Sequence, residues 1–181
     1  MTYTEKHIVL KDGRSALFRL PHPDDAPELL RYLKQTAGET HFLLRTPEEC
    51  VMTLEEERTY LERMLLSQDK VMILCEVEGE LAGNCQIERK TKQKNRHRAM
   101  IGIALFKKYW GLGIGTEMFK ELIRIGNEMG VEQLELEVIE GNTRAMKLYE
   151  KMGFKVTGEK PNAIRLEDGT RLSEYYMVRA L

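Results

Sequence analysis

Three alternating glycines near the middle of the chain, Gly111, Gly113 and Gly115, limit its possible folds more than any other feature of the sequence. An apolar stretch with strand character, residues 100–106, precedes them, and a helical pattern follows them. A glycine-rich turn between a strand and a helix exposes successive backbone N–H groups, and the helix adds the positive end of its dipole. Residues 111–116 are therefore predicted to bind a phosphate or pyrophosphate, the alternative being a turn that binds no anion.

The spacing of these glycines argues against two other nucleotide-binding motifs. A dinucleotide-binding Rossmann fingerprint places Gly-x-Gly-x-x-Gly after the first strand, whereas Thr116 stands where its third glycine would fall. The glycine run also lies past the middle of the chain, behind at least two other strands. A P-loop requires Gly-Lys-Ser/Thr, which does not occur in this sequence. Nucleotide-dependent enzymes of these two classes are therefore not expected.

A second motif spans residues 142–154 and reads Asn, two residues, Ala, two residues, Leu-Tyr, two residues, Met-Gly-Phe. It resembles the second signature of the GNAT family of N-acetyltransferases, and the glycine run resembles the pyrophosphate loop of that family. The two motifs occur in the family's order and spacing, and the resemblance covers residues 71–178. The C-terminal stretch 166–177 is nearest in pattern to the branch that acetylates ribosomal-protein N-termini and polyamines.

The resemblance implies a mixed α/β (α+β) fold in a single domain over residues 1–181. The expected sheet is mostly antiparallel, with helices on both faces and a splayed central pair of parallel strands. Alternating apolar residues and turn signals predict strands at 7–10, 15–20, 71–77, 81–88, 97–106, 134–139, 154–157 and 174–178. Helices are predicted behind Pro23, behind the capping box Thr53-x-x-Glu56, at 113–130 and at 142–152.

The resemblance implies acetyl-CoA as the co-substrate and no metal. Its pantetheine arm would pair with the backbone of Ile103, Ala104 and Leu105, as an added strand does. Its pyrophosphate would lie on Gly111, Leu112, Gly113, Ile114, Gly115 and Thr116, and the second motif would contribute cofactor contacts from Asn142, Ala145 and Tyr149. Asn142 is also well suited to cap the following helix. Trp110 departs from the family's Gln or Arg at the first loop position, which removes one side-chain phosphate contact.

The implied activity is direct transfer of an acetyl group from acetyl-CoA to a primary amine in a ternary complex. Tyr149 matches the tyrosine that often donates a proton to the departing thiolate in this family, the alternative being a tyrosine that only packs. The rival function is a non-catalytic acyl-CoA-binding or regulatory module. It is motivated by the absence of a carboxylate at the start of the strand before the loop, where this chain has Ala99 and Met100.

Attack on the acetyl group needs a neutral amine and therefore a base. His97 and Glu88 are the first candidates, because a turn over 89–96 would place them opposite each other on neighbouring strands. A surface pair without a catalytic role is the alternative. Glu137 and Glu140 are further candidates, since they lie near where the two parallel strands should splay apart.

The acceptor is predicted to be a small-molecule amine or a protein or peptide N-terminus. Its pocket should come from residues 22–66 and the last hairpin. Polar residues in the first of these segments could meet a cationic amine, or could simply be solvated: Glu39, Thr40, His41, Glu48 and Glu49. The basic run 89–98 is read as a solvated loop, with a positive collar near the cofactor as its alternative.

Composition bears on location and partners. The formal net charge is −1, which favours neither nucleic acid nor an anionic membrane as a partner. Three cysteines without framework spacing indicate a reducing compartment, and no long apolar segment suggests a signal peptide or a membrane span. We therefore expect a cytoplasmic protein without a bound metal, and a homodimer is possible.

Overall fold

Eight strands form one sheet in the computed structural model, which describes residues 3–181, and their order is β1-β2-β3-β4-β5-β6-β8-β7. The strands are β1 (Lys6–Val9), β2 (Ser15–Arg19), β3 (Lys70–Val77), β4 (Glu80–Arg89), β5 (Arg98–Leu105), β6 (Gln133–Ile139), β7 (Lys155–Arg165) and β8 (Arg171–Ala180). The α-helices are α1 (Ala26–Glu39), α2 (Leu54–Leu66), α3 (Ile114–Glu128) and α4 (Thr143–Lys151). Short 3₁₀ turns cover η1 (Pro23–Asp25), η2 (Pro47–Glu49) and η3 (Lys107–Tyr109).

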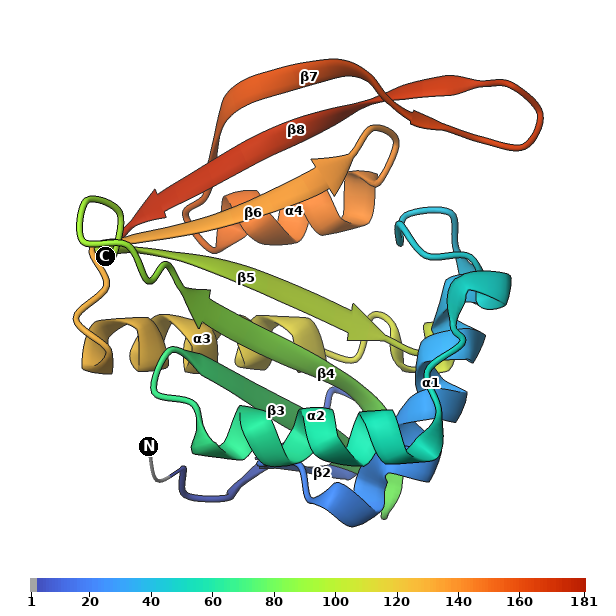
Figure 1. Ribbon diagram of the computed structural model, residues 1–181, viewed down its shortest axis with the longest axis vertical. Coiled ribbons are helices and arrows are strands. Elements are labelled where there is room, and N and C mark those ends of the chain that lie inside the picture. The colour runs from blue at the N-terminus through green and yellow to red at the C-terminus, as the bar shows by residue number, and fades with distance from the viewer. Residues whose placement is uncertain (1–2) are drawn as a thin grey trace.

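Strands β5 and β6 form the parallel pair of this otherwise antiparallel sheet. They pair over three positions, Arg98–Met100 against Gln133–Glu135, and then diverge (Figure 1). Beyond that point β6 continues beside β8, while β5 continues beside β4. The expected mixed sheet with a splayed central pair is therefore confirmed, and the divergence leaves one edge of β5 without a neighbouring strand.

Two helices cover each face of the sheet. Helices α1 and α2 lie in front of the lower strands in Figure 1, and α3 and α4 lie behind the sheet. Side chains along β4 alternate between the two faces of the sheet. Cys85 and Ile87 are fully buried in the core cluster on one face. Asn84 and Gln86 point to the other face and line a cavity. Tyr32 attaches α1 to β5, because its hydroxyl donates a hydrogen bond of 2.8 Å to the carbonyl of Ala104.

The structure confirms the predicted order of helices and strands and moves several boundaries. The capping box at the start of α2 is present, with Thr53 and Glu56 bonding each other's backbone N–H groups. The last two strands are longer than predicted, because pairing extends to Arg165 and Arg171 beside the turn at the end of the hairpin. No helix within residues 3–181 is both long and apolar enough to cross a membrane.

Glu121 fixes α3 to β1 from a nearly buried position, with 5% of its surface exposed. Lys6 Nζ donates to its Oε1 at 2.8 Å, and Arg124 Nε donates to its Oε2 at 3.0 Å. Burial by itself raises the pKa of this carboxyl, but the two charged donors outweigh burial and hold the pKa below its usual value. The ionised form of Glu121 therefore stabilises the folded state.

We expect Glu121→Gln to lower the free energy of unfolding at neutral pH by about 1–3 kcal/mol, the usual worth of a charge-assisted hydrogen bond. The folded-state pKa is depressed, so this stabilisation is present above the ordinary glutamate pKa and is lost as the pH falls through the folded value. Urea unfolding at a series of pH values should show the two proteins converging in acid. Glu128→Gln, which removes an exposed partner of the same arginine, is the control and should have a smaller effect.

Candidate active site

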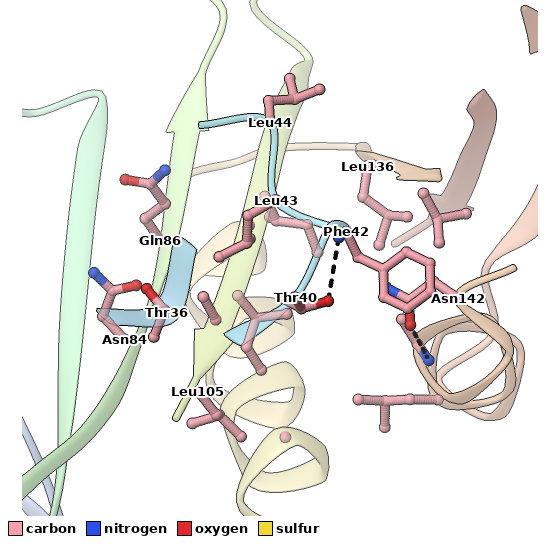
Figure 2. A pocket seen from close by; sticks show the side chains of 18 of the residues that line it. Thr36, Thr40, Phe42, Leu43, Leu44, Asn84, Gln86, Leu105, Leu136 and Asn142 are labelled. Carbon is pink, nitrogen blue, oxygen red and sulfur yellow. Dashed lines mark hydrogen bonds between the residues drawn. The ribbon is translucent and has the colours of Figure 1, made fainter. Parts of the chain in front are cut away.

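A cavity of about 780 Å³ opens where β5 and β6 diverge. Its lining comes from α1, α2 and the segment between them, from the turn after β1, from β3, β4, β5 and β6, from the glycine-rich turn and α3, and from α4 and β8. Figure 2 shows Asn84, Gln86 and Thr36 on one side of this space and Leu136 and Asn142 on the other. The two predicted motifs, which are far apart in sequence, therefore meet in one cavity.

The glycine-rich turn presents free backbone donors to this cavity. Gly111 and Gly113 have φ angles of +84° and +95°, a backbone region that side chains with a Cβ rarely occupy. Gly113 is the N-cap of α3 and has no side chain to satisfy the first turn, and the N–H of Thr116 bonds to the Gly113 carbonyl at 3.0 Å. The N–H groups of Ile114 and Gly115, which precede that bond, have no intrahelical acceptor.

Two basic side chains that the sequence analysis did not identify stand beside this turn. The N–H of Lys11 bonds to the Leu112 carbonyl at 3.2 Å, and its Cγ lies 3.7 Å from where a Cβ of Gly113 would be. The Arg144 guanidinium stacks on the Trp110 ring at 3.1 Å from the centroid. Both side chains line the cavity, so positive charge reaches the turn although Trp110 carries none. Only the fold brings Lys11 here, since it lies far away in sequence.

The exposed edge of β5 carries unpaired backbone groups. The ladder to β4 uses even-numbered residues of β5, as shown by the bonds from Lys90 N–H to the Arg98 carbonyl and from Phe106 N–H to the Ala82 carbonyl. The odd-numbered residues Ile101, Ile103 and Leu105 therefore direct their N–H and C=O groups toward the divergence. The Trp110 indole N–H donates a hydrogen bond of 2.9 Å to the Leu105 carbonyl. The peptide groups around Ile103 remain available to an extended, amide-containing ligand.

Helix α4 closes the other side of the cavity with the second motif. Asn142 caps the helix, since its Oδ1 accepts a bond of 3.3 Å from the Ala145 N–H, and both residues line the cavity. Tyr149 also lines it, with its ring 5.2 Å from that of Phe119. Burial raises the pKa of Tyr149 to about 12, so its phenol is protonated and can donate at neutral pH.

The expected pairing of Glu88 with His97 is wrong. The turn closes at Lys90 and Arg98, so the ladder places Glu88 opposite Met100 and leaves His97 before the start of β5. Glu88 instead forms an ion pair with Lys70 at 2.9 Å. Both expected residues are exposed and neither lines the cavity, so the geometric reason for their catalytic role is removed.

Three other carboxylates line the cavity: Glu57 of α2, Glu137 of β6 and Glu174 of β8. Burial and then the nearby charge of Glu174 raise the pKa of Glu137, against the opposing effects of Lys160 and Lys90. Glu140, the other sequence candidate on this segment, accepts a bond from the Ser173 N–H at 2.8 Å and lies outside the lining. Glu137 is therefore the sequence candidate that the fold directs toward the space beside β5.

The remaining sequence expectations are decided in a similar way. Of the five polar residues proposed to meet the amine, only Thr40 lines the cavity, and Glu39 accepts a bond from the Lys107 N–H at 2.6 Å instead. The basic run 89–98 contributes nothing to the lining; its ends belong to β4 and β5, where Arg89 pairs with Asp69 and Arg98 with Glu135. Cys75 and Cys85 are buried free thiols, whereas Cys50 is half-buried. Within residues 3–181 no group of three or more His, Cys, Asp or Glu side chains is arranged to hold a metal ion.

Comparison with known proteins gives consistent matches. Residues 27–154 match the model of the acetyltransferase (GNAT) family. An L-amino acid N-acetyltransferase of Escherichia coli is 30% identical over 112 residues, which cover 61% of this chain and 67% of that protein. A crystal structure of a GNAT-family acetyltransferase from Streptococcus pneumoniae has a TM-score of 0.87 and 28% identity, covering 92% of this chain and 99% of that one.

A more distant structure shares the fold. A putative acetyltransferase from Salmonella typhimurium, solved with its cofactor acetyl-CoA, has a TM-score of 0.78 and 16% identity. The match covers 91% of this chain and 92% of that one. At this identity the likeness concerns the arrangement of helices and strands.

Proposed function

The chain belongs to the acetyltransferase (GNAT) family, and on this premise we propose that it moves the acetyl group of acetyl-CoA directly to a primary amine while both substrates are bound. One observation carries the proposal. A turn with free backbone amides lies at one end of an unpaired strand edge, and both face a cavity that also contains Tyr149 and Glu137. An anion site, a backbone docking edge, a proton donor and a carboxylate at the cavity wall are the groups that this reaction needs.

Acetyl-CoA is expected to lie along the turn and the edge of β5. The amides of residues 111–116 bind the pyrophosphate, and the cations of Lys11 and Arg144 add charge beside it. The amide groups of pantetheine pair with the backbone around Ile103. This arrangement brings the thioester to the part of the cavity where β5 leaves β6.

Proton transfer at both ends of the reaction is assigned to two side chains. Glu137 takes the proton that the attacking ammonium loses, and its raised pKa makes it a better proton acceptor than an ordinary glutamate. The amine nitrogen forms a bond to the acetyl carbon, and the carbon–sulfur bond breaks with its electrons on sulfur. After the attack the nitrogen releases its second proton to solvent. Tyr149 gives its phenolic proton to the thiolate and is reprotonated from solvent, and Glu137 releases its proton to solvent, so one proton is released overall.

The acceptor enters from the side of α1 and α2 and is a small-molecule amine or a peptide N-terminus. One relative, the Escherichia coli protein above, is named for L-amino acids, which supports a small amine. We further propose that residues 1–181 act as one domain in the cytoplasm, where the free thiols stay reduced, without nucleic acid or membrane as a partner and without a metal. Association into a homodimer is compatible with this activity.

The anion site predicts the behaviour of Gly113→Val. A β-branched residue resists the left-handed backbone and places its side chain where the pyrophosphate approaches, so acetyl-CoA affinity should fall about tenfold or more. Titration calorimetry with acetyl-CoA measures this, with NAD and ATP as ligands that should not compete. Gly130→Val is the matched control, since Gly130 also has positive φ (+68°) but lies beyond the far end of α3. Equal affinity of a folded Gly113→Val protein and wild type would contradict the assignment of the turn.

Tyr149→Phe tests the acid. The substitution keeps the ring and its packing and removes the donor, so kcat should fall by about 10²–10⁴-fold with little change in acetyl-CoA affinity or melting temperature. Tyr175→Phe on β8, outside the cavity lining, is the control. An unchanged kcat under conditions where chemistry limits the rate would exclude the role, and a loss confined to cofactor affinity would make the hydroxyl a binding contact.

Glu137→Gln tests the base. In wild type, kcat should rise with pH as Glu137 ionises, and the apparent pKa of this limb should lie above that of an ordinary glutamate because burial and Glu174 oppose ionisation. The variant should lose about 10²–10⁴-fold in kcat together with this limb. Glu140→Gln removes a carboxylate from the same segment outside the cavity and should leave the profile unchanged. A variant that binds acetyl-CoA and keeps the limb would overturn the assignment.

A further inference from the structure

Glu57 on α2 is a buried carboxylate to which the described residues, 3–181, offer no partner. Its exposed fraction is 2%, and within residues 3–181 its Oε2 has no hydrogen-bond partner. No lysine, arginine or histidine of this part of the chain lies within 4.0 Å of it in an ion pair. Burial raises the pKa of this carboxyl, and only Arg45 opposes the shift. An unpaired buried carboxylate destabilises the fold, so its presence calls for a ligand that the free protein does not contain.

The surroundings of Glu57 indicate what that ligand is. It lines the same cavity as the glycine-rich turn, on the wall that α1, α2 and the segment between them build. That wall is otherwise largely apolar, with Leu33, Leu43 and Met52 among its side chains, and Met72 of the neighbouring β3 also lines the cavity. A carboxylate at an apolar wall fits a positive charge carried at the end of a hydrocarbon chain.

The charge of Glu57 is suited to binding a cationic group of the acceptor that takes no part in the reaction. A buried negative charge keeps a neighbouring ammonium protonated, because it stabilises the charged form. The attacking amine must instead lose its proton, and Glu137 stands on β6 beside the free edge of β5, where the acetyl group is expected. The two carboxylates lie on different walls of the cavity, so one can hold a cation while the other accepts a proton.

We propose that Glu57 binds a second, non-reacting cationic group of the acceptor, so that preferred acceptors are amines with another ammonium or guanidinium group beyond an apolar spacer. The inference rests on the proposed function for the identity of the reaction, and it adds the acceptor class. Glu57 is then a specificity-determining residue. Arg45 also lines the cavity. Its positive charge favours the opposite kind of acceptor, one with an anionic tail.

The test compares three sets of primary amines in which only the tail differs. They are α,ω-diamines, simple alkylamines and ω-amino carboxylates, matched at spacers of three to six methylene groups. Their affinities for the CoA-saturated protein are measured by titration calorimetry, which needs no turnover. The variants are Glu57→Gln and, as a control on the same helix, Glu62→Gln, which removes an exposed carboxylate outside the lining.

Wild type and Glu62→Gln should bind the best diamine about 10- to 100-fold more tightly than the matched alkylamine, the range that one charge-assisted hydrogen bond supplies. Glu57→Gln should abolish this preference, keep its affinity for CoA, and melt at the same or a higher temperature, because the unpaired buried charge is gone. For a diamine that the enzyme acetylates, Glu57→Gln should have a higher KM than wild type and nearly the same kcat.

Three results would overturn the proposal. They are equal affinity for diamine and alkylamine in wild type, a preference for the anionic tail, or a preference for the diamine that survives Glu57→Gln. A loss of kcat with unchanged KM in Glu57→Gln would likewise reject an anchoring role. Failure of the proposed function has a separate signature, since it appears as absent CoA binding or absent acetyl transfer whatever tail the amine carries.

Discussion

The short parallel contact between β5 and β6 is the constraint on which the site depends. Three residue pairs hold the two strands together, and each strand is then retained by its antiparallel neighbour on the other side. Because a strand edge exposes a row of unpaired N–H and C=O groups, this divergence creates both a cavity and a backbone docking surface without breaking the sheet. The glycine-rich turn follows β5 directly, so its amides lie at the end of that same edge. A longer parallel ladder would fill the space where two substrates must meet.

Side chains around the divergence keep it open and give it polarity. Tyr32 and Trp110 bond the carbonyls of Ala104 and Leu105, which ties α1 and the glycine-rich turn to the end of β5. The small residues Gly102 and Ala104 leave room above the strand. Lys11 and Arg144 bring positive charge to the turn, whereas Glu57, Glu137 and Glu174 bring negative charge to the rest of the lining. The cavity therefore offers one region to an anionic cofactor and another to a cationic acceptor.

The carboxylates of the cavity differ from those that stabilise the fold. Glu121 is nearly buried but is bonded by two cations, and its ionised form favours the folded state. Glu57 is buried and has no ion pair within residues 3–181, and burial raises its pKa. Glu137 is more exposed, and its pKa is raised by partial desolvation and by the nearby charge of Glu174. Groups that cost stability in the free protein are those that a functional site retains, because they complete their interactions only with a ligand.

The sequence by itself determined the order of elements, the two motifs and the family, because these depend on local periodicity, turn residues and capping signals. Gly113 at the N-cap of α3 and Asn142 at that of α4 could be placed from their neighbours in the chain. Tertiary structure alone decided which charged groups reach the cavity. A turn that closes at Lys90 and Arg98 shifted the register and separated Glu88 from His97. The cavity also receives Lys11 from a turn, Glu57 from α2 and Glu174 from β8. No local pattern could have identified these three residues, because burial and charge partners are properties of the folded chain.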